Sequence, residues 1–147
     1  MEFEIRQINY GSAEYEESLR IRDEIFRKPW GLSIYDDDNS ADAKDILFAA
    51  FDGAEMVGMT FLQTENPQTA RIRSVITIPR ARGIGLGKKL MDKAEELAFE
   101  MGFHRLVLRA RVSALGFYEK LGYKSVGEIY EYRRVPHVEM EKLIGGN

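Results

Sequence analysis

The feature that most constrains the fold is a glycine-rich turn between an apolar segment and an amphipathic one. Residues 75–78 are Val-Ile-Thr-Ile, which is typical of a strand, and a helical pattern begins at Leu86. Gly83, Gly85 and Gly87 stand at alternate positions around that helix start. Glycine lacks a β-carbon, so backbone N–H groups there can close on an anion, and a helix N-terminus adds unpaired donors and a partial positive charge. The pattern therefore predicts a strand, a bare turn and a helix in direct succession.

Basic side chains flank this turn, which therefore predicts a site for a phosphate or pyrophosphate group. Arg80, Arg82, Lys88 and Lys89 contribute full positive charges. The residues expected to line the site are Arg82, Gly83, Ile84, Gly85, Leu86, Gly87 and Lys88. A basic helix start on a solvated surface is the alternative interpretation of the same residues.

Two common nucleotide-binding motifs do not fit the turn. A P-loop needs Ser or Thr after Gly-Lys and a glycine five residues before it, but Lys89 and Arg82 occupy those positions. The dinucleotide fingerprint G-x-G-x-x-G fails because its last glycine would fall on Lys88 or Leu90. Neither a P-loop nucleoside triphosphatase nor a Rossmann fold is therefore expected.

The rest of the chain predicts a single α+β domain over residues 1–147. Apolar alternation or short Ile- and Val-rich runs indicate strands, and a four-residue apolar spacing indicates helices. The expected strands are 3–8, 46–51, 56–63, 70–78, 106–108, 123–130 and 138–143, and the expected helices are 12–28, 86–101 and a short one capped by Ser113. Residues 31–44, which include three consecutive aspartates, are expected to form a solvated loop. The sheet should be mixed and mostly antiparallel, with helices beside it.

Composition excludes several classes of function. The chain has no cysteine, which rules out disulfides, zinc-thiolate sites and cysteine nucleophiles, and its two histidines cannot form an all-histidine metal cage. We therefore expect no metal. The net charge of -3 gives no reason to expect a nucleic-acid partner. No apolar stretch approaches the roughly 18 to 20 residues that span a bilayer. We expect a cytoplasmic protein that binds neither nucleic acid nor membrane.

Two segments resemble the GNAT superfamily of acyl-CoA N-acyltransferases. Arg82-x-x-Gly85-x-Gly87 is similar to the superfamily's Q/R-x-x-G-x-G/A signature, and the proline before it resembles the usual end of the fourth strand. Residues 110–123, Ala-Arg-Val-Ser-Ala-Leu-Gly-Phe-Tyr-Glu-Lys-Leu-Gly-Tyr, are similar to its A-x-x-N-x-x-A-x-x-F-Y-x-x-x-G-F/Y segment. One helix and one strand separate the two segments, as in the superfamily. Met56-Val57-Gly58 and the Pro-His pair at 136–137 extend the likeness along the chain.

The resemblance implies a GNAT fold and direct transfer of the acetyl group of acetyl-CoA to a primary amine. The acceptor would be a small molecule, a peptide or a protein, bound together with acetyl-CoA in a ternary complex. The signature turn would hold the pyrophosphate, and a strand bulge would let the pantetheine arm bond to the backbone of Val75, Ile76 and Thr77. Ser113 replaces the asparagine usual at its position and is a candidate contact to pantetheine. A homodimer is also an expectation of the resemblance.

Catalytic roles follow the same resemblance. Tyr118 stands where the superfamily commonly places a tyrosine that serves as general acid to the leaving thiolate, and packing is the alternative role. His137 is the best candidate general base by residue type, because the pKa of histidine lies near neutrality. A structural role is the alternative for His137.

The acceptor site should be lined by the first helix, the loop after it and the C-terminal strands. The candidate lining residues are Arg22, Trp30, Tyr35 and Tyr130, together with Tyr132 and His137. The aromatic rings suit an ammonium group, whereas Arg22 suits an acidic one, so the acceptor stays open. Arg22 falls on the apolar stripe of the first helix, and we expect its guanidinium at the solvent rim, with a position facing a pocket as the alternative.

Two other functions are consistent with these residues. One is a GNAT-shaped module that binds acyl-CoA and regulates without turnover. The other is a nucleotide-phosphate binder outside the acyltransferases, which would bind ATP or NAD as well as acyl-CoA.

Overall fold

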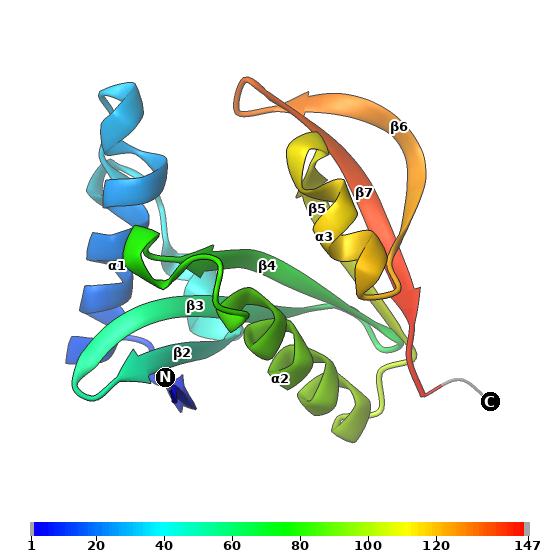
Figure 1. Cartoon of the computed structure of the whole chain (residues 1–147), viewed down its shortest axis with the longest axis horizontal. Helices are drawn as coiled ribbons and strands as arrows, with labels where there is room; N and C mark the ends of the chain where they lie inside the picture. The colour runs from blue at the N-terminus through cyan, green and yellow to red at the C-terminus, as the bar shows by residue number, and fades with distance from the viewer. Residues whose placement is uncertain (1, 146–147) are drawn as a thin grey trace. The chain divides into compact units, whose positions relative to one another are not determined.

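The computed structural model describes residues 2–145, which divide into two compact units (Figure 1). Unit 1 contains the described residues up to Leu62 and Ser74–Ala94, and unit 2 contains Gln63–Arg73 and the described residues from Glu95 onward. The strands follow the order β1-β2-β3-β4-β5-β7-β6 in the sheet. Strands β3 and β4 and helix α2 each contribute residues to both units.

The observed elements confirm the predicted α+β class and its mixed, mostly antiparallel sheet. The strands are β1 Glu4–Ile8, β2 Ile46–Asp52, β3 Glu55–Asn66, β4 Thr69–Thr77, β5 Arg105–Arg111, β6 Lys124–Tyr132 and β7 Val135–Leu143. The helices are α1 Ala13–Phe26, α2 Leu86–Glu100 and α3 Leu115–Lys120, with short 3₁₀ turns at Lys28–Trp30, Ile34–Asp36, Ser40–Lys44, Pro79–Ala81 and Val112–Ala114. Only the β4–β5 pair is parallel among the pairings between described strands.

Helix α1 begins where its sequence predicts and ends two residues earlier than predicted, at Phe26 rather than Lys28. The Ser12 hydroxyl accepts a hydrogen bond from the Tyr15 N–H at 3.1 Å, which caps the first turn. The helix stops before the 3₁₀ turn that contains Pro29. Tyr15 and Leu19 are buried in the core of unit 1, as the apolar stripe of this helix predicts.

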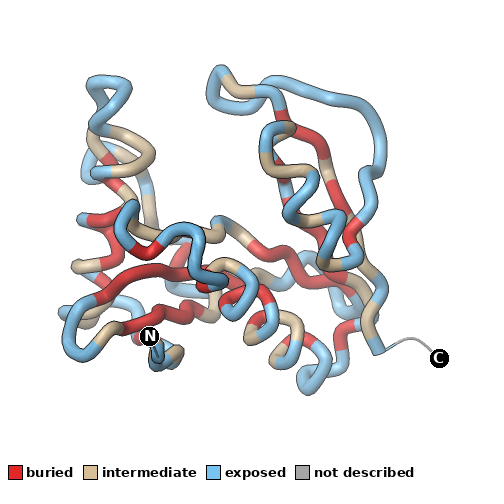
Figure 2. The backbone as a smooth tube through the Cα atoms, viewed as in Figure 1, coloured by how far each residue is buried: buried red, intermediate tan, exposed pale blue. Residues whose placement is uncertain are grey.

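The core of unit 1 lies in two layers, one on each face of its strands. One cluster contains α1 residues with alternate residues of β2 and β3, including Leu47, Met59 and Phe61. The other cluster includes Ala50 on β2 and Leu86 and Leu90 on α2. The red segments of Figure 2 show that β2 and most of β3 are buried along their length. Helices α1 and α2 therefore shield opposite faces of these strands.

Gly58 allows the first turn of α2 to pack closely on β3. A β-carbon at this position would lie 2.8 Å from the Ile76 carbonyl oxygen and 3.1 Å from a methyl group of Leu86. Any side chain there would push β3 away from β4 and from α2. Gly58 thus fixes the position of the helix that begins at the glycine-rich turn.

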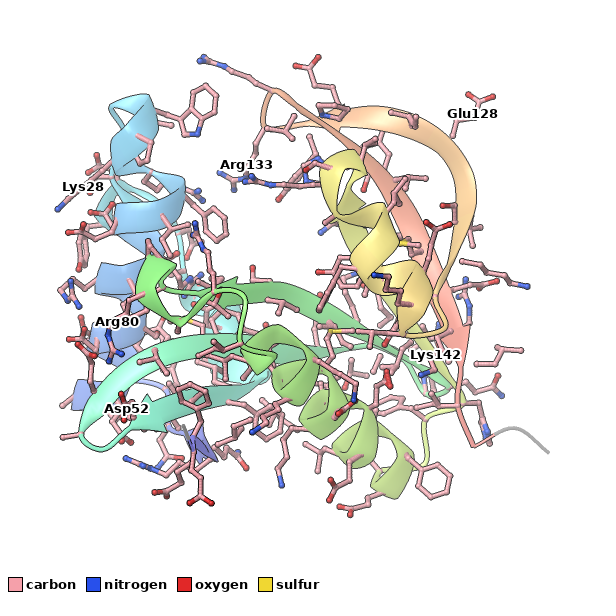
Figure 3. The ribbon with its side chains drawn as sticks, viewed as in Figure 1. Lys28, Asp52, Arg80, Glu128, Arg133 and Lys142 are labelled. Atoms are coloured by element: carbon pink, nitrogen blue, oxygen red, sulfur yellow. The ribbon has the colours of Figure 1, made fainter. Side chains whose placement is uncertain are left out.

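Unit 2 is built on β5, which lies between β4 and β7. Strand β4 pairs in parallel with β5 through Thr69, Ala70 and Arg71, and β7 pairs with β5 antiparallel along its length. Strand β6 is the edge strand, and Figure 2 shows it exposed throughout. A bulge between Val126 and Tyr130 interrupts its pairing with β7, and Glu128 lies on this outward bend (Figure 3). Figure 1 shows α3 beside β5 and β7.

The prediction of a solvated loop at 31–44 is wrong for part of that segment. Ile34 and Asp42 are 2% and 1% exposed. The Asp23 carboxylate accepts a hydrogen bond from the Ile34 N–H at 2.8 Å, and Asp42 accepts one from the Tyr15 hydroxyl at 2.8 Å. Because these contacts satisfy its polar groups, the segment can pack against α1 rather than extend into water.

The prediction that Ser113 caps α3 is also wrong. Ser113 lies inside the 3₁₀ turn at Val112–Ala114, and Ala114 occupies the N-cap position of α3 without a side-chain hydrogen bond. The backbone begins to coil at Val112, so the serine falls one residue too early to receive an N–H of the helix. Strand β7 also begins earlier than predicted, at Val135, and so includes His137.

Among residues 2–145, no helix combines the length and apolar character needed to cross a membrane.

Candidate active site

The glycine-rich turn of unit 1 has the open backbone that its sequence predicts. Gly83 and Gly85 adopt φ values of 78° and 82°, and an added β-carbon at either position would meet no atom within 4 Å. The first helical hydrogen bond runs from the Lys89 N–H to the Gly85 carbonyl at 3.2 Å. The preceding amide groups of the helix start therefore have no acceptor within the helix. Such a turn can surround a phosphate group with backbone donors.

The four basic residues at the turn have different partners. Arg80 pairs with Asp52 and Glu55 on the β2–β3 hairpin. Figure 3 labels Arg80 and Asp52. Lys88 pairs with Asp92 one helical turn later at 2.9 Å, where both side chains are exposed. Arg82 donates from Nε to the Thr77 carbonyl at 3.3 Å.

Within the described part of the chain, neither Arg82 nor Lys89 pairs with a carboxylate. The net positive field at the turn therefore depends mainly on Arg82, Lys89 and the helix terminus.

Strand β4 changes its backbone conformation just before the turn. Its pairing with β5 ends at Arg71, and Ser74 has a φ of 63°, which is rare for a residue with a β-carbon. Strand β4 therefore departs from regular strand geometry at Ser74, and the bulge that the family resemblance implies stays a prediction. Ile76 beyond it is buried, and Val75 and Thr77 are half-buried.

Tyr118 lies on α3 in unit 2, with its ring set among other aromatic rings. Its ring centroid is 5.0 Å from that of Phe117 and 6.1 Å from that of Tyr123, both in edge-on contact. Burial raises the pKa of the Tyr118 hydroxyl above its ordinary value of 10.0. The phenol therefore keeps its proton through the neutral range and can serve as a hydrogen-bond donor.

His137 lies on β7 with one ring nitrogen already engaged. Nδ1 is 2.8 Å from the Val135 carbonyl oxygen. Because a carbonyl only accepts, Nδ1 carries the hydrogen, and Nε2 of the neutral ring is left with a lone pair. The ring is 8% exposed and contacts Tyr130 at 6.2 Å and Tyr132 at 5.4 Å between centroids. This arrangement fixes the tautomer that a general base requires.

The candidate acceptor residues of unit 1 fall into two groups. Trp30 and Tyr35 are 54% and 57% exposed and can meet a ligand. The expectation of a solvent-rim position for Arg22 is wrong, since its side chain is 11% exposed and pairs with Asp42 at 2.9 Å. The guanidinium carbon also lies 4.8 Å from the centroid of the Phe61 ring. Asp42 thus balances the charge of Arg22 inside the protein.

Tyr130 of unit 2, the remaining acceptor candidate, stacks on His137 and is more than one-third exposed. Strands β6 and β7 bring the two residues directly opposite each other. The bulge before Tyr130 sets this register. Tyr130 and His137 are therefore predicted site residues that the structure brings together, as are Tyr132 and His137.

Sequence reasoning missed a buried ion cluster in unit 2. Arg71, whose side chain is 8% exposed, donates to both oxygens of Glu139 at 2.9 and 2.7 Å and to Glu65 at 2.6 Å. These bonds hold the pKa of the Glu139 carboxyl below its ordinary value. The three residues come from three strands, and no local pattern announces them. The structure also brings Arg109 and Arg133 to the ring of Tyr132.

Comparison with known proteins agrees with this fold. The model of the acetyltransferase (GNAT) family matches residues 15–123. A candidate acetyltransferase of Bacillus subtilis is 35% identical over 74 residues, which are 50% of this chain and 50% of that protein. The YyaT protein of the same organism, whose function is uncharacterized, is 34% identical over 54% of this chain and 53% of its own length. The chain thus matches about half the length of these curated relatives.

Solved structures share the fold over nearly the whole chain. A candidate N-acetyltransferase from Lactobacillus plantarum has a TM-score of 0.86 with 23% identity and covers 98% of this chain and 99% of its own. An aminoglycoside 6′-N-acetyltransferase complexed with coenzyme A has a TM-score of 0.81 with 17% identity, covering 98% of both chains. At these identities the structural likeness shows the fold, and the match to the family's sequence model shows the family. From both findings, the chain belongs to the acetyltransferase (GNAT) family.

Proposed function

We propose that this protein transfers the acetyl group of acetyl-CoA directly to a primary amine within a ternary complex. The observation that carries the proposal is the open turn at Gly83 and Gly85, which presents bare amides at the start of α2 in a chain of this family. The absence of cysteine from the sequence supports direct attack by the amine, because no thiol can hold the acetyl group.

The donor would be held mainly by unit 1. The pyrophosphate would accept hydrogen bonds from the backbone of residues 82–88 and charge from Arg82 and Lys88. The pantetheine arm would bond to the backbone of Val75, Ile76 and Thr77, and Ser113 remains a candidate side-chain contact from unit 2. Acetyl-CoA acts here as a substrate, and the proposed chemistry uses no metal.

The reaction needs a base for the amine and a donor for the leaving group. Nε2 of His137 would take the proton of the acceptor ammonium, and the free amine would attack the thioester carbonyl. A backbone N–H that donates to the resulting oxyanion is typically worth about 3 kcal/mol. The carbon–sulfur bond then breaks and CoA leaves as a thiolate, while the remaining extra proton of the attacking nitrogen passes to that thiolate or to water, which leaves a neutral amide.

Tyr118 would donate its hydroxyl hydrogen to the departing thiolate. A thiol has a pKa of about 8.5, below that of a buried tyrosine, so the phenol stabilises the thiolate chiefly by hydrogen bonding. The raised pKa of Tyr118 keeps this donor protonated across the neutral and mildly alkaline range.

The first test is calorimetric titration of the protein with acetyl-CoA, with CoA, ATP and NAD as comparison ligands. We expect micromolar affinity for acetyl-CoA and much weaker binding of ATP and NAD. Equal binding of all the phosphate ligands, or no binding of acetyl-CoA, would contradict the proposed donor site and favour a solvated basic helix start.

The second test is the substitution Tyr118→Phe. We expect kcat to fall about tenfold to a hundredfold, the range that one hydrogen bond to a charged group supplies, while the Kd for acetyl-CoA stays unchanged. Tyr123→Phe is the matched control, since the Tyr123 hydroxyl already bonds Glu95 at 3.3 Å. Unchanged kcat in Tyr118→Phe would assign the tyrosine to packing. A wild-type protein that binds acetyl-CoA but acetylates no amine would favour the binding-module alternative.

A further inference from the structure

The turn of the β6–β7 hairpin has an unfavourable backbone for its residues. Arg133 and Arg134 form a two-residue connection with φ values of 51° and 69°, between the paired residues Tyr132 and Val135. Glycine and asparagine are the usual residues in such a left-handed turn, because they adopt positive φ at little cost. Strain of this kind persists where the surrounding structure fixes it, and it often marks a functional position.

Two guanidinium groups converge on one ring beside this turn. The guanidinium carbon of Arg109 lies 5.2 Å from the centroid of the Tyr132 ring, and that of Arg133 lies 5.5 Å from it. Figure 3 shows the Arg133 side chain beside the hairpin. Both residues are exposed, and among residues 2–145 neither forms an ion pair with a carboxylate. We call Arg109 and Arg133 the arginine pair.

The nearest carboxylates do not neutralise the arginine pair. Glu139 stands opposite Arg109 in the β5–β7 register, but both of its oxygens accept from Arg71. Glu131 precedes Tyr132 on β6, and successive side chains of a strand point to opposite faces. Arg109 and Arg133 carry like charges beside one ring, and although Glu139 attracts Arg109 electrostatically, a bound anion would add a favourable interaction with both.

The arginine pair is one aromatic ring away from the proposed base. The centroids of the Tyr132 and His137 rings are 5.4 Å apart, in edge-on contact. The guanidinium carbons of Arg109 and Arg133 lie at similar distances from the centroid of the Tyr132 ring. A molecule that reaches both the arginine pair and Nε2 of His137 therefore needs to span only a few bonds. Such a span fits a small molecule with an amine at one end and an anionic group at the other.

We propose that the acceptor is a small amine that also carries a carboxylate or phosphate group, bound by Arg109 and Arg133 while its amine lies at His137. This inference rests on the proposed acetyltransferase function and on the role of His137 in it. The planar fork of a guanidinium donates two parallel hydrogen bonds to either anion, so both groups suit the arginine pair. The ring of Tyr132 holds the two side chains in place before the ligand arrives.

The test compares matched amines in a steady-state assay with saturating acetyl-CoA. The panel is a series of ω-amino carboxylates from β-alanine to ε-aminocaproate, their carboxamides and phosphoethanolamine, each at the same concentration of free amine. We expect kcat/KM for the best charged acceptor to exceed that of its neutral analogue by about tenfold or more, as for one charge-assisted hydrogen bond. The phosphate member of the panel shows which anion the site prefers.

The variants Arg109→Gln and Arg133→Gln should each lower kcat/KM for the charged acceptor about tenfold and leave that for the carboxamide unchanged. Arg134→Gln is the matched control, because Arg134 is the other arginine of the same turn and has a similar positive φ, and this variant should keep the preference. Equal rates for charged and neutral acceptors, or an equal loss in Arg134→Gln and Arg133→Gln, would overturn the inference.

Failure of the inference differs from failure of the proposed function. If carboxamides are acetylated as well as carboxylates, acetyl transfer stands and the anionic acceptor is wrong. If no amine is acetylated, the panel is titrated calorimetrically into the protein saturated with acetyl-CoA. Tighter binding of the charged members that is lost in Arg133→Gln would support the inference, and equal or absent binding of both kinds would overturn it.

Discussion

The turn that begins α2 and the turn that joins β6 to β7 both place two residues in the left-handed backbone region, but with different residues. In unit 1 the residues are Gly83 and Gly85, for which positive φ carries no steric cost. In unit 2 they are Arg133 and Arg134, for which the same region costs roughly 1–2 kcal/mol per residue. The first turn is relaxed and bare, and the second is strained and charged.

The difference follows from what each turn offers to a ligand. A phosphate can be held by backbone N–H groups, so the first turn benefits from residues that have no side chain. An anionic acceptor would be held by guanidinium groups, so the second turn must carry arginine even where glycine would be more stable. The buried cluster of Arg71, Glu65 and Glu139 anchors the strands below the hairpin, and we infer that it supports the strained tip.

Removing this anchor should have the largest effect. For Glu139→Gln we expect the free energy of unfolding at pH 7 to fall by about 2 kcal/mol, less than for a fully buried ion pair because Glu139 is one-third exposed. The hydrogen bonds from Arg71 lower the pKa of Glu139 in the folded protein below its ordinary 4.5. This contribution to stability is therefore present above pH 4.5 and lost as the pH falls below it.

Urea denaturation of wild type and Glu139→Gln at a series of pH values measures this effect. The difference in the free energy of unfolding between wild type and Glu139→Gln should become smaller below pH 4.5. Glu128→Gln, on the exposed bend of β6, is the control and should change stability by less than about 0.5 kcal/mol. A constant difference across the acid range would mean that the ion cluster does not anchor the hairpin.

In the glycine-rich turn, Gly85→Ala should weaken acetyl-CoA binding about tenfold or more. The new methyl group meets no protein atom, but it would stand where the ligand approaches the backbone, and alanine is disfavoured at a φ of 82°. Gly102→Ala is the matched control, because Gly102 has a φ of 88° and similar free space but lies beyond the C-terminal end of α2. Both variants should lose similar stability, measured by thermal unfolding. Equal loss of acetyl-CoA affinity in both would mean that strain, not ligand contact, explains the result.

The smallest expected effect is a gain of stability in the hairpin. Arg134→Gly should raise the free energy of unfolding by about 0.5–1 kcal/mol, since relief of the left-handed strain exceeds the entropic cost of glycine in the unfolded chain. Arg133→Gly should give a similar gain but lose the preference for charged acceptors. If either substitution destabilises the protein, the hairpin is not strained as its φ values indicate, and the comparison between the two turns fails.

Much of the fold could be predicted because its signals are local. Ser12 caps α1, the apolar spacing of α2 faces the core, and the Asp-Gly turn joins β2 to β3, each within a few residues of chain. The wrong predictions about the fold share a different cause. Asp42 is buried because Tyr15 and Arg22 meet it from α1, and Ser113 is no cap because the chain coils one residue before it. Both depend on packing that neighbouring residues do not encode.

The sequence by itself determined the open glycine-rich turn and the family, because glycines at positive φ and a helix start act through the backbone, whatever surrounds them. The ion cluster at Arg71 and the arginine pair were decided only by the tertiary structure. Each joins side chains from different strands, and its chemistry depends on register: one residue of shift in β6 would turn Tyr132 away from Arg109. Backbone chemistry is local, whereas side-chain chemistry across a sheet exists only after the strands have paired.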